Sequence, residues 1–358
     1  MSIVEAIRLL VERGSIEPGL AARCMEELMR GEATHAQAAA FLTALRIRGE
    51  NPAIIAAMSE VTRRFATPIR VSPMKGRLID TCGTGGDLVK TINVSTASGL
   101  VAAAAGCRVA KHGNRSFTGY CGSADFLEGI GVRIDLEPDM VSKCIGSLGF
   151  GFIYAPRYHQ SMRNVMPVRR EIGIRTVFNL LGPLTNPAPI NAQILGVFSR
   201  EFMERVAEAV KILGREEAAI IHGDGGIDEA SIFSETMVIW IRDGEARRVI
   251  LSPESFGLEK ARVEEVIVGS RDECIRRTLE ALAGALGRSH PLTRLLLANS
   301  SLSLMVGGLA DDPAGGAEMA WRVIESGRPI ELLRRLVKET DGDQDRFESW
   351  MEVIKWVF

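Results

Sequence analysis

The sequence lacks the patterns that mark several large classes of protein. Its six cysteines form no Cys-x-x-Cys pair and no zinc-binding spacing, which favours reduced thiols in a cytoplasmic protein over disulfides or a metal centre. No long apolar run is present, so we expect neither a signal peptide nor a membrane-spanning helix. Internal repeats and low-complexity segments are absent too, so nothing indicates a repeat protein.

An excess of charge of one sign is also missing. The chain carries 43 Lys and Arg against 45 Asp and Glu, a formal net charge of −2. This balance gives no indication of a nucleic-acid or membrane partner. Apolar residues make up 46% and charged residues 25% of the 358 residues, as in an ordinary globular protein. The length suggests about two domains.

Several catalytic and binding motifs are missing. No Gly-Lys-Ser/Thr ends a phosphate loop, no Gly-x-Gly-x-x-Gly marks a dinucleotide site, and no Gly-x-Ser-x-Gly elbow is present. His112, His159 and His222 do not show a His-x-x-x-His metal spacing. Nucleophilic acyl transfer, a histidine metal site and a dinucleotide-dependent oxidoreductase are therefore disfavoured.

What is present divides the chain into two parts. Residues 1–67 predict helices only, with Thr34 and Asn51 as helix N-caps and Gly14 as a stop. After a proline-punctuated connection, residues 68–358 alternate short apolar strands with helices, which is typical of a mostly parallel sheet covered by helices. We therefore expect an α/β protein, with a small all-helical N-terminal domain and a larger α/β domain that has a mostly parallel central sheet.

The strands expected in the larger domain precede polar loops. We predict strands at residues 77–80, 107–110, 149–155, 190–198 and 217–223. Two strand-like runs around Asp243-Gly244 predict an antiparallel hairpin over residues 236–251. In open sheets of this kind, ligands bind beyond the carboxyl ends of the strands. Three polar loops follow strands there and are expected to form one site: CGTGGD (82–87), KHGNR (111–115) and HGDGGIDE (222–229).

The glycine loop, CGTGGD, is suited to approach an anion. Glycines let backbone N–H groups come close to a phosphate, and the N-terminus of the following helix adds a favourable dipole. Asn93, Ser95 and Thr96 lie where that helix should begin, and they can cap it or offer oxygens to a ligand. A tight turn followed by a capped helix is the alternative.

The other two loops carry charge. Lys111 and Arg115 flank an imidazole and an amide, which suits a phosphate or forms a solvated basic turn. Asp228 and Glu229 suit an oxygen-liganded Mg²⁺, a pair for acid–base catalysis, or a surface acidic turn. Residues 157–175 add five arginines, of which one held inward would suit a carboxylate. These residues alone predict a Mg²⁺-dependent enzyme whose substrate is a phosphorylated small molecule.

Several long motifs, in order, carry a resemblance to a known family. They are DTCGTGGD with TINVST, AKHGNRS, GSADFLE, APRYHQSMRNVMPVRREIGIRTVFNLLGPLTNPA and HGDGGIDEAS. Over about residues 3–338 the sequence resembles the anthranilate phosphoribosyltransferases. The resemblance implies transfer of the 5-phosphoribosyl group of phosphoribosyl pyrophosphate (PRPP) to the amine of anthranilate. The products would be N-(5-phosphoribosyl)anthranilate and pyrophosphate, in tryptophan biosynthesis.

The same resemblance implies an architecture and partners. The fold would be that of the nucleoside phosphorylase-like transferases, in which helices from about residues 157–190 join the N-terminal helical domain. A cytoplasmic homodimer through the helical domain is implied, with Mg²⁺ as cofactor, two ions per monomer. The partners would be the small-molecule substrates PRPP and anthranilate, and neither a nucleic acid nor a membrane.

Site residues follow from the resemblance by their position in the motifs. Those that match PRPP contacts are Gly83, Gly86, Asp87, Thr91, Asn93, Ser95, Thr96, Lys111 and Ser123. Those that match the anthranilate site are Gly83, Asn114, His159 and Arg169, with Arg169 facing the carboxylate. Those that match magnesium ligands are Ser95, Asp228 and Glu229. No residue matches a certain catalytic acid or base, and Lys111 and Arg169 are expected to act electrostatically.

The sequence departs from the family's pattern in three places. Leu88 follows GTGGD where another glycine is usual, which is expected to stiffen the loop. Phe117, Thr118 and Tyr120 replace residues that are commonly smaller or more polar. The tail, 341–358, matches no motif, and its apolar residues predict a docked helix. These residues are Trp350, Ile354, Trp356 and Val357.

Two alternative functions remain open. A pyrimidine-nucleoside or AMP phosphorylase shares the expected fold and would cleave a nucleoside with inorganic phosphate. A non-catalytic ligand-binding homologue should have lost the glycine loop or the Asp228-Glu229 pair, and this chain keeps both. KHGNR, GPLTNP and the acidic pair favour the transferase.

Overall fold

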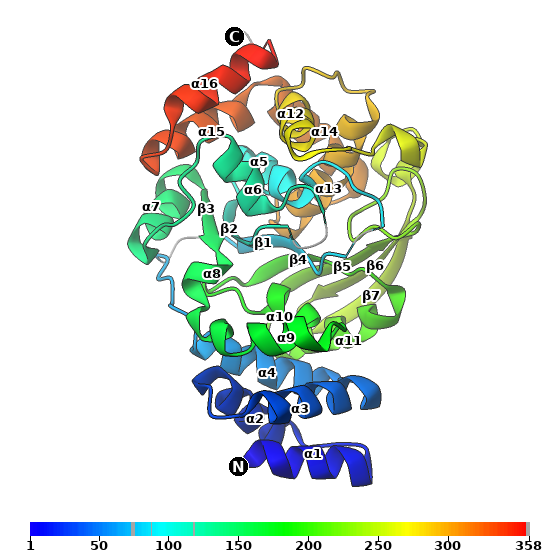
Figure 1. Ribbon diagram of the computed structural model, residues 1–358. Coiled ribbons are helices and arrows are strands. Elements are labelled where there is room, and N and C mark those ends of the chain that lie inside the picture. The colour runs from blue at the N-terminus through cyan, green and yellow to red at the C-terminus, as the bar shows by residue number, and fades with distance from the viewer. Residues whose placement is uncertain (73–75, 87, 117–118, 356–358) are drawn as a thin grey trace.

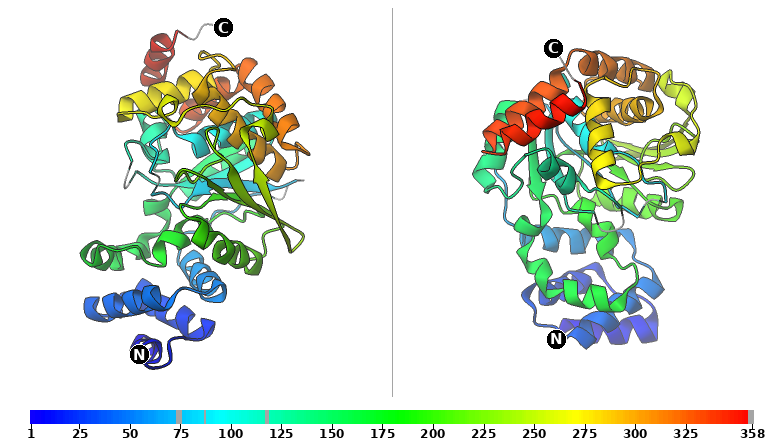
Figure 2. Two further views of the ribbon diagram at one scale, coloured as in Figure 1. Left: turned by 90° about the vertical axis from the view of Figure 1, so that its right-hand side faces the viewer. Right: turned by 45° about the horizontal axis from the view of Figure 1, so that its top comes forward.

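The computed structural model describes residues 1–72, 76–86, 88–116 and 119–355. A bundle of N-terminal helices lies at one end, the sheet crosses the middle, and the C-terminal helices cover the other end (Figure 1). The first and the last helix of the chain lie at opposite ends of the molecule in every view (Figure 2). Within the described ranges, no helix combines the length and apolar character that crossing a membrane requires.

The N-terminal residues form helices only, as predicted. The bundle contains α1 (Ser2–Arg13), α2 (Pro18–Arg30), α3 (His35–Arg48) and α4 (Pro52–Arg64). Thr34 caps α3, because its hydroxyl accepts a hydrogen bond from the Gln37 backbone N–H at 3.2 Å. Asn51 caps α4 by accepting from the Ile54 N–H at 2.8 Å. Both predicted caps are thus confirmed.

The larger part is built on a seven-stranded sheet with the order β3-β2-β1-β4-β5-β6-β7. The strands are β1 (Leu78–Gly83), β2 (Arg108–Gly113), β3 (Phe150–Tyr154), β4 (Ala192–Gly196), β5 (Glu217–Gly223), β6 (Thr236–Arg242) and β7 (Glu245–Leu251). Strands β1 to β5 run parallel, while β6 pairs antiparallel with both β5 and β7. The predicted hairpin and the predicted fold class, a helical bundle plus a mostly parallel α/β part, are confirmed.

Twelve further α-helices follow the N-terminal bundle in the described ranges. They are α5 (Val94–Ala105), α6 (Ser123–Gly129), α7 (Pro138–Leu148), α8 (Ala155–Tyr158), α9 (Met166–Ile172), α10 (Phe178–Leu184), α11 (Arg200–Ile212), α12 (Arg271–Leu282), α13 (Pro291–Val306), α14 (Pro313–Glu325), α15 (Arg328–Glu339) and α16 (Gln344–Val353). Short 3₁₀ turns are η1 (Gln160–Asn164), η2 (Pro253–Phe256) and η3 (Val263–Glu265).

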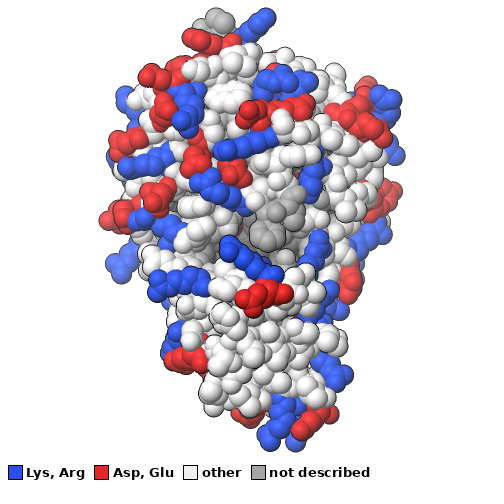
Figure 3. Space-filling model, in the orientation of Figure 1, with Lys and Arg blue, Asp and Glu red and all other residues white. Residues whose placement is uncertain are grey.

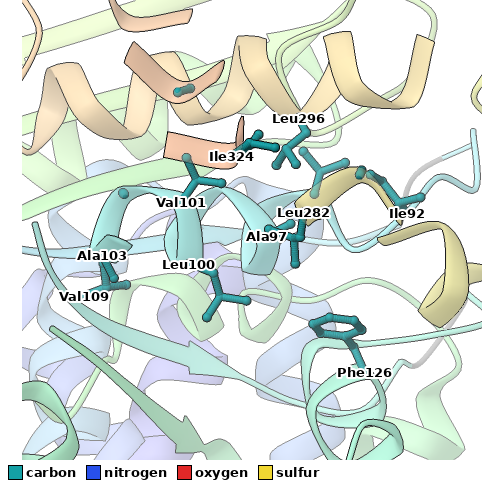
Figure 4. Close-up of a cluster of buried hydrophobic side chains, with 14 of the residues drawn as sticks. Ile92, Ala97, Leu100, Val101, Ala103, Val109, Phe126, Leu282, Leu296 and Ile324 are labelled. Atoms are coloured by element: carbon teal, nitrogen blue, oxygen red, sulfur yellow. The ribbon is translucent and has the colours of Figure 1, made fainter. Parts of the chain in front are cut away.

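Helix α5 lies at the centre of the main apolar core. Leu100 and Val101 are fully buried, because α5 packs against β1 and β2 on one side and against α13, α14 and α15 on the other. Figure 4 shows its side chains between the sheet and residues such as Leu296 and Ile324. The helix that follows the glycine loop is therefore held rigidly, which fixes the start of that helix in space.

The segment from β3 to β4 packs on the N-terminal helices. Turn η1 contacts α2, α9 contacts α3, and α10 contacts α4. Val165 and Val168 share one apolar cluster with Phe41 and Leu45 of α3. Leu195 of β4 belongs to the same cluster. The helical bundle and the sheet are thus continuous through packed side chains, and the proposed division after residue 67 stays a prediction.

The tail forms a docked helix, α16, as its apolar residues predicted. Phe347, Met351 and Ile354 are buried. The indole N–H of Trp350 donates to the Gly129 carbonyl at 3.0 Å. Trp356 and Val357, which were also named for docking, lie outside the described residues.

Candidate functional site

The glycine loop and the acidic loop are joined at the carboxyl edge of the sheet. The Gly85 backbone N–H donates to Asp228 Oδ2 at 2.7 Å. Gly83 lies so close that a Cβ atom there would clash with the same carboxylate oxygen. In the view of Figure 3, Lys and Arg side chains lie around the middle of the molecule. Two of the three loops predicted to form one site therefore do meet.

The glycine loop adopts a backbone that favours glycine. Gly85 and Gly86 have φ angles of 68° and 90°, in the left-handed region. A Cβ atom at Gly86 would lie 2.6 Å from Nη2 of Arg175, whose guanidinium lies 3.9 Å from the centre of the Phe198 ring. Arg175 thus lies against the loop, although no local pattern distinguishes it among the five arginines of its segment. Asp87 lies outside the described residues.

Polar residues at the start of α5 bond to neighbouring loops. Thr96 Oγ1 donates to Asn93 Oδ1 at 2.7 Å, and Asn93 Nδ2 donates to the Cys121 carbonyl at 2.8 Å. Asn93 makes no side-chain cap on α5. Thr91 Oγ1 donates to the Ile92 carbonyl at 3.2 Å. Asn93 therefore links the start of α5 to the segment that follows KHGNR.

The acidic pair, Asp228 and Glu229, lies next to two groups that stabilise its negative charge. Burial raises the pKa of Glu229 well above its ordinary value, and the neighbouring Asp228 charge raises it further. The charge of Lys111 and a hydrogen bond from the Ser95 backbone N–H act in the opposite direction. Lys111 is buried, and its Nζ donates to the His112 carbonyl at 3.1 Å. Two crowded carboxylates and one buried lysine therefore lie together beside the start of α5.

This arrangement fits a divalent cation that is held partly by the substrate. Among the described residues, no three or more His, Cys, Asp or Glu side chains are grouped closely enough to hold a metal alone. Asp228, Glu229 and the Ser95 hydroxyl could supply oxygen ligands, with the remainder from water and phosphates, as Mg²⁺ prefers. A cation there would also relieve the repulsion within the acidic pair.

The loop after KHGNR is closed by one carboxylate. Asp125 Oδ2 accepts from the backbone N–H groups of Ser116 and Gly122, at 2.8 and 2.9 Å. Ser123 Oγ donates to the Asn114 carbonyl at 3.3 Å, across the mouth of this loop. Tyr120 is exposed, and Phe117 and Thr118 lie outside the described residues.

His159 has a partner that the sequence did not suggest. Its Nε2 lies 3.2 Å from Nε2 of His112, and both imidazoles are buried. Burial lowers the pKa of His159 to about 4. Burial, followed by the neighbouring His159 and Lys111, lowers the pKa of His112 well below its ordinary value. Both rings are therefore neutral near pH 7, and one donates its N–H to the other. The sequence could have indicated His112 as a site residue, because it lies next to Lys111 near the end of the predicted strand.

Arg169 is partly buried without a carboxylate partner among the described residues. Its guanidinium lies 5.1 Å from the centre of the Phe178 ring, and Nη1 donates to Met166 Sδ at 3.6 Å. Burial lowers its pKa. Arg157, by contrast, bonds with Asp135 at 2.8 Å and with Glu137 on the surface. Of these two arginines, Arg169 is the one available to an anionic ligand.

Leu88 connects the glycine loop to the acidic loop. Its backbone N–H donates to the Gly226 carbonyl at 3.0 Å. A Cβ atom at Gly226 would lie 2.7 Å from Leu88 Cδ1, so the leucine side chain covers this glycine. The rest of the side chain faces solvent, since Leu88 is 82% exposed. Leu88 therefore contacts the acidic loop at Gly226, in addition to restricting the backbone of the glycine loop.

Comparison with known proteins agrees with this arrangement. The helical bundle domain of the glycosyl transferase family matches residues 4–66, and its a/b domain matches residues 75–330. An anthranilate phosphoribosyltransferase of Chloroflexus aggregans is 45% identical over 344 residues, which cover 96% of this chain and 100% of the relative.

Solved structures agree with the sequence relatives. The anthranilate phosphoribosyltransferase of Thermus thermophilus has a TM-score of 0.87 and 39% identity, and the match covers 94% of this chain and 99% of that one. The Saccharomyces cerevisiae enzyme in complex with PRPP and Mg has a TM-score of 0.87 and 26% identity, covering 95% and 98%. Another structure of the yeast enzyme holds 4-fluoroanthranilate. The chain therefore belongs to the anthranilate phosphoribosyltransferases, enzymes of the glycosyl transferase family.

Proposed function

We propose that this chain transfers the 5-phosphoribosyl group of PRPP to the amine of anthranilate, as a cytoplasmic step of tryptophan biosynthesis. The observation that carries this proposal is the contact between the glycine loop and Asp228, with Glu229 and Lys111 beside it. Backbone N–H groups, a lysine and two carboxylates suit a magnesium pyrophosphate. The yeast relative's structures with PRPP and Mg and with 4-fluoroanthranilate support both substrates.

The PRPP site would be formed by the glycine loop, the starts of α5 and α6 and the end of β2. Its residues are Gly83, Gly86, Asp87, Thr91, Asn93, Ser95, Thr96, Lys111 and Ser123. Glycine at 83 and 86 lets Asp228 and Arg175 lie directly against the loop, because a Cβ atom at either position would clash with those side chains. Ser95, Asp228 and Glu229 would hold Mg²⁺, two ions per monomer, which would neutralise charge on the pyrophosphate.

The anthranilate site would be formed by Arg169, Asn114, His159 and Gly83. A partly buried guanidinium with no acidic partner among the described residues suits the carboxylate of anthranilate. The neutral His112–His159 pair adds no positive charge. That neutrality suits a reaction in which the ribose ring becomes positive as pyrophosphate leaves.

Catalysis in this proposal depends on position and charge. Lys111 and the loop N–H groups stabilise the negative charge that develops on the leaving oxygen. The neutral arylamine of anthranilate attacks C1 of the ribose, and its N–H becomes acidic only after the bond forms. A strong general base is therefore unnecessary, and holding the two substrates together supplies a large share of the rate.

The decisive test is the loss of anthranilate fluorescence with purified protein, PRPP and Mg²⁺. We expect a decay that needs all three, with no change when PRPP or the metal is left out. A flat trace from folded protein would contradict the proposal. The same protein would then be tested for release of a base from nucleosides with inorganic phosphate, which a phosphorylase would give.

A homodimer through the N-terminal helices is part of the proposal. Val4 and Val11 of α1 are 50% and 62% exposed, and Ile47 of α3 is 75% exposed, so the bundle presents apolar side chains to solvent. The mass in solution, measured by light scattering, should be twice that of the chain. Val11→Glu should lower it, whereas a monomeric wild-type protein would contradict this assignment.

A further inference from the structure

The tail helix α16 is attached to the C-terminal end of α6. The Trp350 indole N–H donates to the Gly129 carbonyl at 3.0 Å, and Arg346 Nη1 approaches the Glu128 carbonyl at 3.4 Å. The Asp343 backbone N–H donates to the Gly131 carbonyl at 2.8 Å. The donors to Gly129 and Gly131 satisfy carbonyl groups of the kind that the end of a helix and its turn leave without intrahelical partners.

Two glycines bring the tail and the turn after α6 into backbone contact. A Cβ atom at Gly131 would clash with the Asp343 carbonyl oxygen, and one at Gly342 would clash with the Gly131 carbonyl oxygen. Gly131 also has a φ of 96°. Both positions therefore require glycine for the approach, which makes this a fitted contact and not a loose one.

Helix α6, which begins at Ser123, in turn bonds to the loop that carries Asn114. The Asp125 carboxylate accepts hydrogen bonds from the backbone N–H groups of Ser116 and Gly122. One turn further, Glu128 accepts two bonds from the Arg115 guanidinium, at 2.6 and 2.9 Å. A shift of α6 would therefore move both sides of the loop at once.

Helix α6 is too short to fix its own position. It spans seven residues, about two turns, and helices of this length are marginal without neighbours. From α12, Arg271 Nη2 donates to the Asp125 carbonyl at 3.2 Å, near the start of α6. Phe126 and Leu127 anchor the helix in the apolar core, and at its C-terminal end α16 adds the bonds to Gly129 and Glu128. The tail lies beyond residue 330, where the match to the family's a/b domain stops.

We propose that α16 is a brace that holds α6, and with it the loop residues 114–116 and 119–122, in position for the phosphoribosyl substrate. Trp350 is the main positioning residue, through its bond to Gly129 and its packing on the apolar core. The identity of the substrate rests on the proposed function. The bracing itself rests only on the contacts between α16, α6 and the loop.

The first test compares two variants of the full chain. Trp350→Phe keeps an aromatic ring and removes the N–H donor, and it should raise the KM for PRPP about three- to tenfold while changing kcat less. Glu348→Gln weakens the bonds from Arg334 to Glu348, at 2.7 and 3.2 Å, which join α15 to α16 without contacting α6. It should leave the KM for PRPP unchanged.

A second readout needs no turnover. In Trp350→Phe, the Ser116 and Gly122 amide hydrogens should exchange with deuterium faster than in the wild type and in Glu348→Gln. If Trp350→Phe loses its fold, Arg346→Gln tests the same contact from an exposed position.

Unchanged exchange together with an unchanged KM would overturn the brace. Faster exchange in a chain whose wild type does not consume anthranilate would leave the brace standing and overturn the proposed function. The two failures are therefore distinguishable.

Discussion

The Gly85 backbone N–H and the Asp228 carboxylate form a 2.7 Å hydrogen bond that ties the glycine loop to the acidic loop. Gly83 must be glycine for this approach, because a Cβ atom would clash with Asp228 Oδ2. We predict that Gly83→Ala lowers kcat/KM for PRPP at least about tenfold, since overpacking typically costs about 1–3 kcal/mol. Steady-state kinetics at varied PRPP concentration would measure the loss.

Gly146→Ala is the matched control for Gly83→Ala. Gly146 lies in α7 with open space around its Cβ position. Alanine there should keep full activity and raise the free energy of unfolding by up to about 1 kcal/mol. Equal activity losses in the two variants would show that the Gly83–Asp228 approach is unimportant.

Removing one charge of the acidic pair should have opposite effects on activity and on metal-free stability. We predict that Glu229→Gln raises the Mg²⁺ concentration for half-maximal rate about tenfold, because an oxygen ligand of full charge is lost. Without metal, the same variant should be more stable than the wild type at pH 7. The raised pKa of Glu229 means that its ionisation costs folding free energy as the pH rises above the ordinary value.

Thermal unfolding in a chelator would measure the second effect. Glu216→Gln, near the opposite end of β5, is the control and should change neither quantity. If Glu229→Gln were less stable than the wild type without metal, the two carboxylates of the acidic pair would not destabilise the folded protein, and this prediction would be wrong.

The neutral histidine pair should make stability depend on pH. Folding lowers the pKa of His159 from 6.5 to about 4, so the unfolded chain takes up a proton first as the pH falls. The free energy of unfolding therefore decreases between pH 6.5 and pH 4, by up to about 3 kcal/mol from this residue. Urea unfolding at several pH values should give a shallower decrease for His159→Gln. Exposed His35→Gln should keep the wild-type slope.

Arg169→Ala should impair the use of anthranilate more than that of PRPP. Loss of a desolvated carboxylate contact costs about 2–5 kcal/mol, which lowers kcat/KM for anthranilate by about thirtyfold or more. Arg170→Ala, at the exposed neighbouring position in α9, should change neither substrate's kinetics. Equal losses for both substrates in Arg169→Ala would rule out the assignment.

Local patterns predicted the elements well and the contacts between distant elements poorly. Thr34 and Asn51 were found because a cap depends on the next three residues only. The hairpin of β6 and β7 was found because Asp243-Gly244 marks its turn. These features need no knowledge of the rest of the chain.

The missed features all depend on long-range packing. The His112–His159 contact joins residues 47 positions apart, and Trp350 reaches Gly129 across 221 positions. Arg175 was indistinguishable from the other arginines of its segment until the fold placed it against Gly86. Hydrophobic periodicity shows which face of an element is buried but not which partner covers it.

The antiparallel end of the sheet has a consequence for association. Strand β7 forms the outer edge, and most of its residues are exposed. Glu245, Arg247 and Arg248 place charges along that edge. Charged side chains on an open strand oppose pairing with a strand of another molecule. This edge of the sheet is thus protected against edge-to-edge pairing, and a specific partner surface is better sought away from β7.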